Sequence, residues 1–296
     1  MPDADTAALH ASGVTLEPIK AWAEMLHRYV ASVLGMLVLS LVALGWKQRH
    51  ESGYPWRTTL ILMLLILLQG AFGAFTVTLR LWPQIVMLHL LGGLSIMTMC
   101  LWLHLRLRQQ GRGSPQSMHR PGILWCIVGG LLVLQIALGG WTSSNYAGLA
   151  CQGFPACNTQ LWPAMDWSEG FHLTQTIGPN YLHGKLHAEA RTAIHVAHRL
   201  GALWLGMGII LLAWRYRNHG TLRKYTVILL VAYTAQATIG IVNVLLWLPL
   251  GLALAHTAGA ACLVLALTLG IWRSATTGSD ESTAGGARDG ERATPI

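Results

Sequence analysis

The sequence alternates between long apolar blocks and short polar connections. Seven blocks of about 20 residues are bounded by charged residues, proline or glycine, and a helix that crosses the hydrocarbon core of a bilayer needs about 20 residues. We therefore predict an all-α polytopic membrane protein with seven transmembrane helices. The predicted helices span residues 22–46, 58–79, 85–107, 122–142, 192–214, 225–246 and 250–272.

Lysine and arginine gather in alternate connections, which predicts the orientation of the helices because cytoplasmic loops attract these residues. The connections at 47–57, 106–120 and 215–224, with the segment after 272, contain most of the 20 basic residues. The other side receives an outer N-terminal segment, residues 1–21, and a long outer loop, residues 143–191. Residues 274–296 are rich in Gly, Ser, Thr and Ala, and we expect a disordered cytoplasmic tail.

Composition supports a membrane protein and excludes an ordinary soluble domain. Hydrophobic residues make up 53% and charged residues 11% of the chain, against about 25% charged in soluble domains. The net charge of +8 comes from basic residues dispersed among short loops, so we predict no nucleic-acid partner. The 13 histidines outnumber the 12 acidic residues, which indicates metal or haem chemistry.

The chain contains an internal repeat. E-M-L-H-R at 24–28 matches H-V-A-H-R at 195–199, and the spacing Q-x-x-x-G occurs at 69–73 and at 236–240. The repeat predicts two similar half-bundles, three helices in residues 22–110 and four in residues 121–273. The first half is expected to lack its opening helix, either through a start codon chosen too late or through a real loss. Gln69, Gln135 and Gln236 are interpreted as interhelical hydrogen-bonding residues.

Four histidines lie about five residues inside the outer ends of their predicted helices: His27, His89, His198 and His256. Equal depth on parallel helices favours two facing pairs, His27 with His89 and His198 with His256, each suited to ligate haem iron. The alternative is that these histidines only form hydrogen bonds inside the membrane. A lone pair in each half is too few ligands for zinc.

The two halves differ three residues before the first histidine, where one has Glu24 and the other His195. Residues i and i+3 share a helix face, so Glu24 is predicted to point toward the same haem as His27 and to act as a catalytic carboxylate. A simple ion pair with Arg28 is the alternative. Arg28 and Arg199 are candidates to bind haem propionates, or are arginines that reach the membrane interface.

Two cysteines lie in the outer loop as C-Q-G-F-P-A-C at 151–157. An oxidising compartment would allow a disulfide between Cys151 and Cys157, and the glycine and proline between them favour a tight turn. Two free thiols and a metal-binding pair are the alternatives.

Motifs along nearly the whole chain from Trp22 to Trp272 resemble the haem A synthase family, in its proteobacterial and mitochondrial-type branch. They are E-M-L-H-R-Y, V-M-L-H-L-L-G-G, Q-I-A-L-G-G-W-T-S-S-N-Y-A-G-L-A-C, F-P-A-C, P-A-M-D-W-S-E-G-F-H-L and A-I-H-V-A-H-R-L-G-A-L. The resemblance implies eight transmembrane helices, so we expect this chain to depart from the family by lacking the first.

The resemblance implies an enzyme that oxidises the C8 methyl of haem O to a formyl group by successive hydroxylations, for cytochrome oxidase assembly. It implies that His198 and His256 ligate a haem b cofactor. His27 and His89 would surround the substrate haem O, with Glu24 as the catalytic carboxylate. The competing hypothesis is a dihaem b-type cytochrome that exchanges electrons with quinone. A transporter is disfavoured because no helix is broken near its middle.

The resemblance also implies a location and partners. We expect a multi-pass protein of the bacterial cytoplasmic membrane, with the haem sites toward the periplasm. Candidate partners are haem O and the haem O synthase that supplies it, an electron-transfer partner, membrane lipid and a second copy of the chain.

Overall fold

The computed structural model describes residues 18–51, 53–111 and 118–290. Residues 1–17 and 291–296, which belong to the predicted N-terminal segment and tail, lie outside the described residues. The helices are α2 (Pro18–Lys47), α3 (Trp56–Thr78), α4 (Pro83–Gln110), α5 (Ile123–Ser144), α6 (Trp167–Gly170), α7 (Ala188–Arg215), α8 (Leu222–Leu245) and α9 (Leu250–Gly290). Within the described part of the chain there is no β-strand, and Cys157 and Gln160 form one isolated β-bridge.

The prediction of seven membrane-spanning helices is confirmed for the part of the chain that the structure describes, and the protein is a multi-pass membrane protein. All helices except α6 are long and apolar enough to cross a bilayer. Helices α2 and α7 begin four residues earlier than predicted, because the first turn of each carries a charged residue, Lys20 or Glu189, outside its apolar block. The short α6 was not predicted; Asp166 caps it by accepting a hydrogen bond from the Glu169 N–H.

The last helix continues past the predicted boundary. Residues 274–290 were expected to be disordered, but the structure describes α9 as helical to Gly290. No proline occurs between Leu250 and Pro295, and an established helix is extended more easily than a new one is nucleated. Composition alone was therefore a poor guide to where this helix ends.

The chain divides into two compact units, residues 1–63 and residues 64–296. In the first unit, α2 packs on the start of α3. The Trp46 and Trp56 rings meet edge to face at 6.0 Å between centroids, and a Cβ added at Gly45 would lie 3.0 Å from the Thr59 hydroxyl oxygen. The predicted half-bundles at 22–110 and 121–273 follow a different boundary and stay a prediction.

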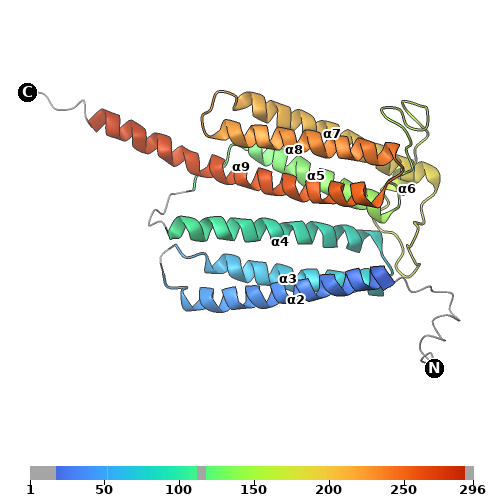
Figure 1. Ribbon diagram of the computed structural model, residues 1–296, viewed down its shortest axis with the longest axis horizontal. Helices are drawn as coiled ribbons and strands as arrows, with labels where there is room; N and C mark the ends of the chain where they lie inside the picture. The colour runs from blue at the N-terminus through green and yellow to red at the C-terminus, as the bar shows by residue number, and fades with distance from the viewer. Residues whose placement is uncertain (1–17, 52, 112–117, 291–296) are drawn as a thin grey trace, which may run out of the picture. The chain divides into compact units, whose positions relative to one another are not determined.

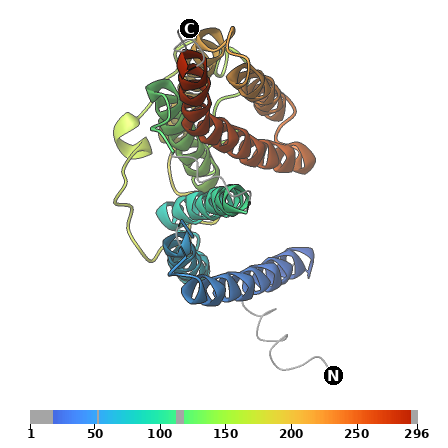
Figure 2. The ribbon, with the colours of Figure 1, turned by 90° about the vertical axis from the view of Figure 1, so that its left-hand side faces the viewer.

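In the second unit, α5, α7, α8 and α9 lie side by side, with α4 against α5 and α9 (Figures 1 and 2). Each of α5 and α8 contacts both α7 and α9, whereas α7 and α9 make no direct helix contact within the described residues. The core contains the buried side chains of Trp125, Val128, Leu205, Leu229 and Leu263. Trp125 is fully buried and lies against Gly270 of α9.

The predicted repeat is visible in the way three helices end. After α3, α5 and α8 the chain turns through a residue with positive φ, and the following N–H donates to the carbonyl five residues back, as in a Schellman cap. The bonds are Leu81 N–H to Thr76 O (2.8 Å), Ala147 N–H to Thr142 O (2.8 Å) and Leu248 N–H to Asn243 O (2.7 Å). Each accepting carbonyl lies seven residues after the glutamine of its helix.

The outer loop is tied to the turn between α3 and α4. The Trp82 indole N–H donates to Gln175 O at 3.1 Å, and the Gln84 amide donates to Leu173 O at 2.9 Å. The Tyr181 N–H donates to Arg80 O at 3.1 Å. The loop that follows α5 therefore covers the outer end of the α3–α4 hairpin.

The contact between Trp125 and Gly270 provides a test of this packing. A Cβ added at Gly270 would collide with the indole ring, whereas one added at Gly130 of α5 meets nothing within 4 Å. Gly270→Ala should destabilise the protein by about 1–3 kcal/mol through overpacking, and Gly130→Ala should not. Thermal unfolding in detergent measures both variants, and equal unfolding temperatures would contradict the packing described.

Candidate functional site

Two of the predicted ligands lie within interaction range of each other. His198 is on α7 and His256 is on α9, and their imidazoles interact electrostatically. The two rings interact although α7 and α9 do not pack directly on each other within the described residues. The structure therefore brings together the predicted pair of the second half.

A glutamine on a neighbouring helix holds each of these histidines. Gln236 Nε2 on α8 donates to His256 O at 2.7 Å, and Gln135 Nε2 on α5 donates to His198 O at 3.1 Å. The Gln135 amide nitrogen also lies 3.2 Å from His198 Nδ1. Both glutamines therefore fix the backbone of a predicted ligand, and Gln135 also contacts the ring of His198.

The imidazoles rest against glycines four residues after these glutamines. A Cβ added at Gly139 would lie 3.2 Å from His198 Cε1, and one at Gly240 would lie 2.9 Å from His256 Cε1. A side chain at either position would displace the ring, so the glycines leave the space that each imidazole fills.

This donor set fits haem iron rather than a protein zinc site. Among the described residues no group of three or more His, Cys, Asp or Glu side chains is placed to hold a metal ion, and zinc sites use three or four such ligands. Haem iron needs only two axial ligands, on opposite faces. Two imidazoles on helices that are not packed together, with His256 Nδ1 buried and unpaired among the described residues, meet that need.

The predicted site of the first half is divided between the two units. His89 on α4 repeats the arrangement of His256: Gln69 Nε2 donates to His89 O at 2.6 Å, and a Cβ at Gly73 would lie 3.1 Å from His89 Cε1. Glu24 and His27 are on α2, in the unit of residues 1–63. The pairing of His27 with His89 stays a prediction.

Glu24 forms the ion pair that the sequence left open as an alternative. Arg28 Nη2 donates to Glu24 Oε1 at 2.6 Å, and both side chains are more than half exposed. The pair orients the carboxylate on α2. The same ion pair engages Arg28, which we predicted as a candidate to bind a haem propionate.

His195 stands in the second half at the position that Glu24 occupies in the first, and it is buried. Its side chain has 4% of its surface exposed, and its ring lies near the backbone of Ala147. It lies near His198 and Arg199, with which it interacts electrostatically. The two halves therefore differ in exposure as well as in residue type at this position.

The disulfide between Cys151 and Cys157 is confirmed, and Arg199 holds its loop. The guanidinium donates to Cys151 O at 2.7 Å and to Gly153 O at 2.8 Å, with longer bonds to Pro155 O and Ala156 O. Arg199 follows His198 directly, so the residue after a predicted ligand anchors the outer loop. A contact between Arg199 and a haem propionate stays a prediction.

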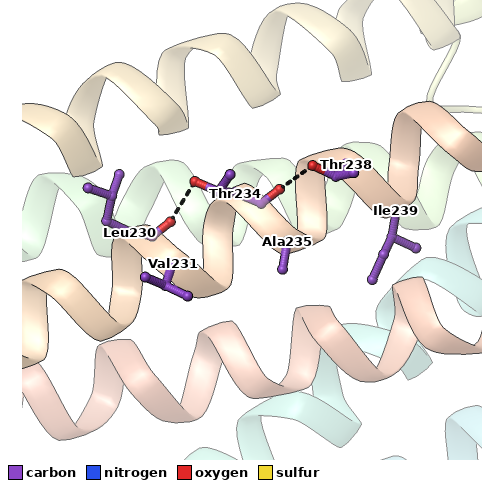
Figure 3. Close-up of a pocket in the computed structure, with 6 residues that line it drawn as sticks. All are labelled: Leu230, Val231, Thr234, Ala235, Thr238 and Ile239. Atoms are coloured by element: carbon purple, nitrogen blue, oxygen red, sulfur yellow. Dashed lines mark hydrogen bonds between the residues drawn. The ribbon is translucent and has the colours of Figure 1, made fainter.

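A surface groove lies along α8, the helix that carries Gln236. It has a volume of about 650 Å³ and is shown in Figure 3. The hydroxyls of Thr234 and Thr238 donate to Leu230 O and Thr234 O within the helix, so the wall is apolar. Its lining is Leu230, Val231, Thr234, Ala235, Thr238 and Ile239.

Comparison with known proteins places this arrangement in a family. The family model of the COX15-CtaA cytochrome oxidase assembly proteins matches residues 7–268. A curated heme A synthase of Shewanella oneidensis is 40% identical over 272 residues, which cover 90% of this chain and 82% of the relative.

The chain belongs to the COX15-CtaA family. More distant members are also named heme A synthase. The one of Hyphomonas neptunium is 28% identical over 86% of this chain and 70% of the relative, and the one of Bacillus licheniformis is 26% identical over 84% and 77%. The predicted family resemblance is confirmed.

In this COX15-CtaA chain the sequence reasoning did not assign Gln69, Gln135 and Gln236 to the histidines. The signal was present, because the separation from glutamine to histidine is 20 residues in both hairpins. It was interpreted only as general helix–helix bonding. The contact of Arg199 with the disulfide loop was also missed, since it joins residues more than 40 positions apart.

Replacing Arg199 tests its hold on the loop of this COX15-CtaA protein. Arg199→Lys should make residues 151–157 more mobile. The single ammonium group of lysine cannot donate to all of the loop carbonyls that the planar guanidinium group of arginine reaches. Hydrogen–deuterium exchange should show faster uptake in that loop. Arg217→Lys, which removes a single exposed bond to Trp214 O, is the control. Unchanged exchange together with an altered haem spectrum would support the propionate contact instead.

Proposed function

We propose that this protein is a haem A synthase, which oxidises the C8 methyl of haem O to a formyl group for cytochrome oxidase assembly. Membership of the COX15-CtaA family supports the proposal, as do the curated relatives named heme A synthase. The structural observation that carries it is the His198–His256 pair, held on two helices that do not pack together among the described residues.

We assign a haem b cofactor to His198 and His256. The glutamine bonds fix the backbone of both residues, and the glycines at 139 and 240 leave space for the imidazole rings. When bound, a haem with two imidazole ligands supplies one-electron redox chemistry. The protein contributes ligand position and an apolar surrounding that influence its potential.

We assign the substrate haem O to the first half, with His27 and His89 as its protein contacts and Glu24 as the catalytic carboxylate. Glu24 accepts a proton as the methyl group is oxidised: with water as the source of oxygen, each hydroxylation releases two protons and two electrons, and the electron-transfer partner receives the electrons. Loss of water from the doubly hydroxylated carbon gives the aldehyde. The ion pair with Arg28 orients the Glu24 carboxylate for this step. The buried His195 at the equivalent place suits a site that holds its haem without converting it.

We place the protein in the bacterial cytoplasmic membrane with the haem sites toward the periplasm. The Cys151–Cys157 disulfide supports this orientation, since an oxidising compartment favours such a bond. The partners that follow from the reaction are the haem O synthase and an electron-transfer protein.

Histidine substitutions should separate the two sites. His198→Ala and His256→Ala should each remove haem b from the purified protein, because one axial imidazole is lost. His89→Ala should leave haem b bound and reduce haem A. Haem content per protein measures the outcome, with His50→Ala, an exposed residue outside the membrane spans, as the control. Loss of haem b from His89→Ala alone would reverse the assignment.

Glu24→Gln should stop haem A formation while haem b stays bound, because the amide has nearly the shape of the carboxylate but cannot accept the proton. Reversed-phase separation of haems from cells that also make haem O measures the product. Glu51→Gln, at an exposed loop residue, is the matched control. Undiminished haem A would remove Glu24 from the mechanism, and a wild-type protein that yields only haem B would identify a dihaem cytochrome.

A further inference from the structure

The contacts around the predicted ligands form a unit that occurs three times. Each unit joins a helix with the sequence Q-x-x-x-G to a helix with the sequence H-x-x-G, and we call it the Gln–His interlock. The three interlocks are Gln69–Gly73 with His89–Gly92, Gln135–Gly139 with His198–Gly201, and Gln236–Gly240 with His256–Gly259.

The second glycine of each interlock, three residues after the histidine, lies against the glutamine side chain. A Cβ added at Gly92, Gly201 or Gly259 would collide with Oε1 of the glutamine in the same interlock. These three Oε1 atoms are buried and have no hydrogen-bond partner in the described structure. The glutamine side chain thus has two contacts. Its Nε2 donates to the histidine carbonyl, and its Oε1 fits in the space beside the glycine, which we call the glycine notch.

This geometry fixes two properties of the ligand. The bond from Nε2 to the histidine carbonyl sets the height of the ligand helix along its neighbour. The glycine four residues after the glutamine sets where the imidazole lies, because a larger residue would occupy the ring's position. A glutamine bond alone would hold the helix but leave the ring adjustable.

The interlocks also determine the separation of His198 and His256. Since α7 and α9 do not contact each other directly among the described residues, their spacing is transmitted through α5 and α8. Gln135 joins α5 to α7, and Gln236 joins α8 to α9. The distance and orientation of two axial imidazoles affect the spectrum and potential of the iron between them.

We propose that Gln135 and Gln236, with the glycines of their interlocks, are positioning residues for the haem held by His198 and His256, and that Gln69 positions His89 in the same way. The inference rests on the proposed function only in taking these histidines as haem ligands. It does not extend to His27, because the residue three positions after it is Val30 and not glycine.

The experiment uses four test variants and one control variant of the full chain. Gln236→Leu removes the donor at similar volume, and Gly259→Ala introduces a Cβ against Oε1. Gln236→Ala, alone and combined with Gly259→Ala, completes a double-mutant cycle. Thr238→Val, which removes a hydroxyl bonded within α8, is the control on the same helix. The readouts are haem b per protein, its rate of loss, the low-spin EPR signal and the midpoint potential.

We expect Gln236→Leu to shift the EPR signal and the midpoint potential while most of the protein stays folded. Gly259→Ala should lose haem about tenfold faster than wild type, the range seen when groups behind a metal ligand are altered. In the Gln236→Ala background the same glycine substitution should have a much smaller effect, because the colliding amide is gone. Thr238→Val should match wild type.

Three results would overturn the inference. An unchanged EPR signal and potential in Gln236→Leu would show that the glutamine does not position the ligand. Independent, additive effects of Gln236→Ala and Gly259→Ala on haem loss and on unfolding temperature would show that the notch contact is unimportant. Absence of haem b from the wild-type protein would overturn the proposed ligand set, and the inference with it.

Discussion

A glutamine amide that bonds to the backbone carbonyl of a neighbouring helix is the interaction on which the described bundle depends. In a bilayer a polar side chain has no water to bond with, and the hydrophobic effect does not drive helices together. Such bonds average about 0.6 kcal/mol in membranes, so their value lies in geometry more than in strength. Gln135 and Gln236 fix the register of two helix pairs and hence the relation between two histidines.

The repeated helices share their turns and glutamine contacts but differ in one polar residue near the histidines. The turns after α3, α5 and α8 and the contacts of three glutamines are nearly the same in each copy. The residue three positions before the first histidine of each half differs, an exposed Glu24 paired with Arg28 and a buried His195. Repeated helices thus keep one way of holding a histidine, while the polar residue nearby differs in charge and exposure.

Hydropathy and residue spacing predicted the spans, the repeat and the His198–His256 pair, because each depends on one helix at a time or on equal depth in the membrane. Contacts between distant segments could not be predicted in this way. The sequence identified Gln236 as a bonding residue but did not show which carbonyl it meets, and it did not connect Arg199 with the disulfide loop. Gly/Ser/Thr-rich composition also suggested disorder in residues 274–290, which the structure describes as helical.

The bonds between the outer loop and the α3–α4 turn have a consequence for the order of assembly. Trp82 and Gln84 bond to carbonyls that follow them by 93 and 89 residues. During synthesis the hairpin is made before these acceptors exist, and the bonds can form only after α5 and the loop that follows it have been made. The bonds at this end of the α3–α4 hairpin therefore form later than the hairpin itself.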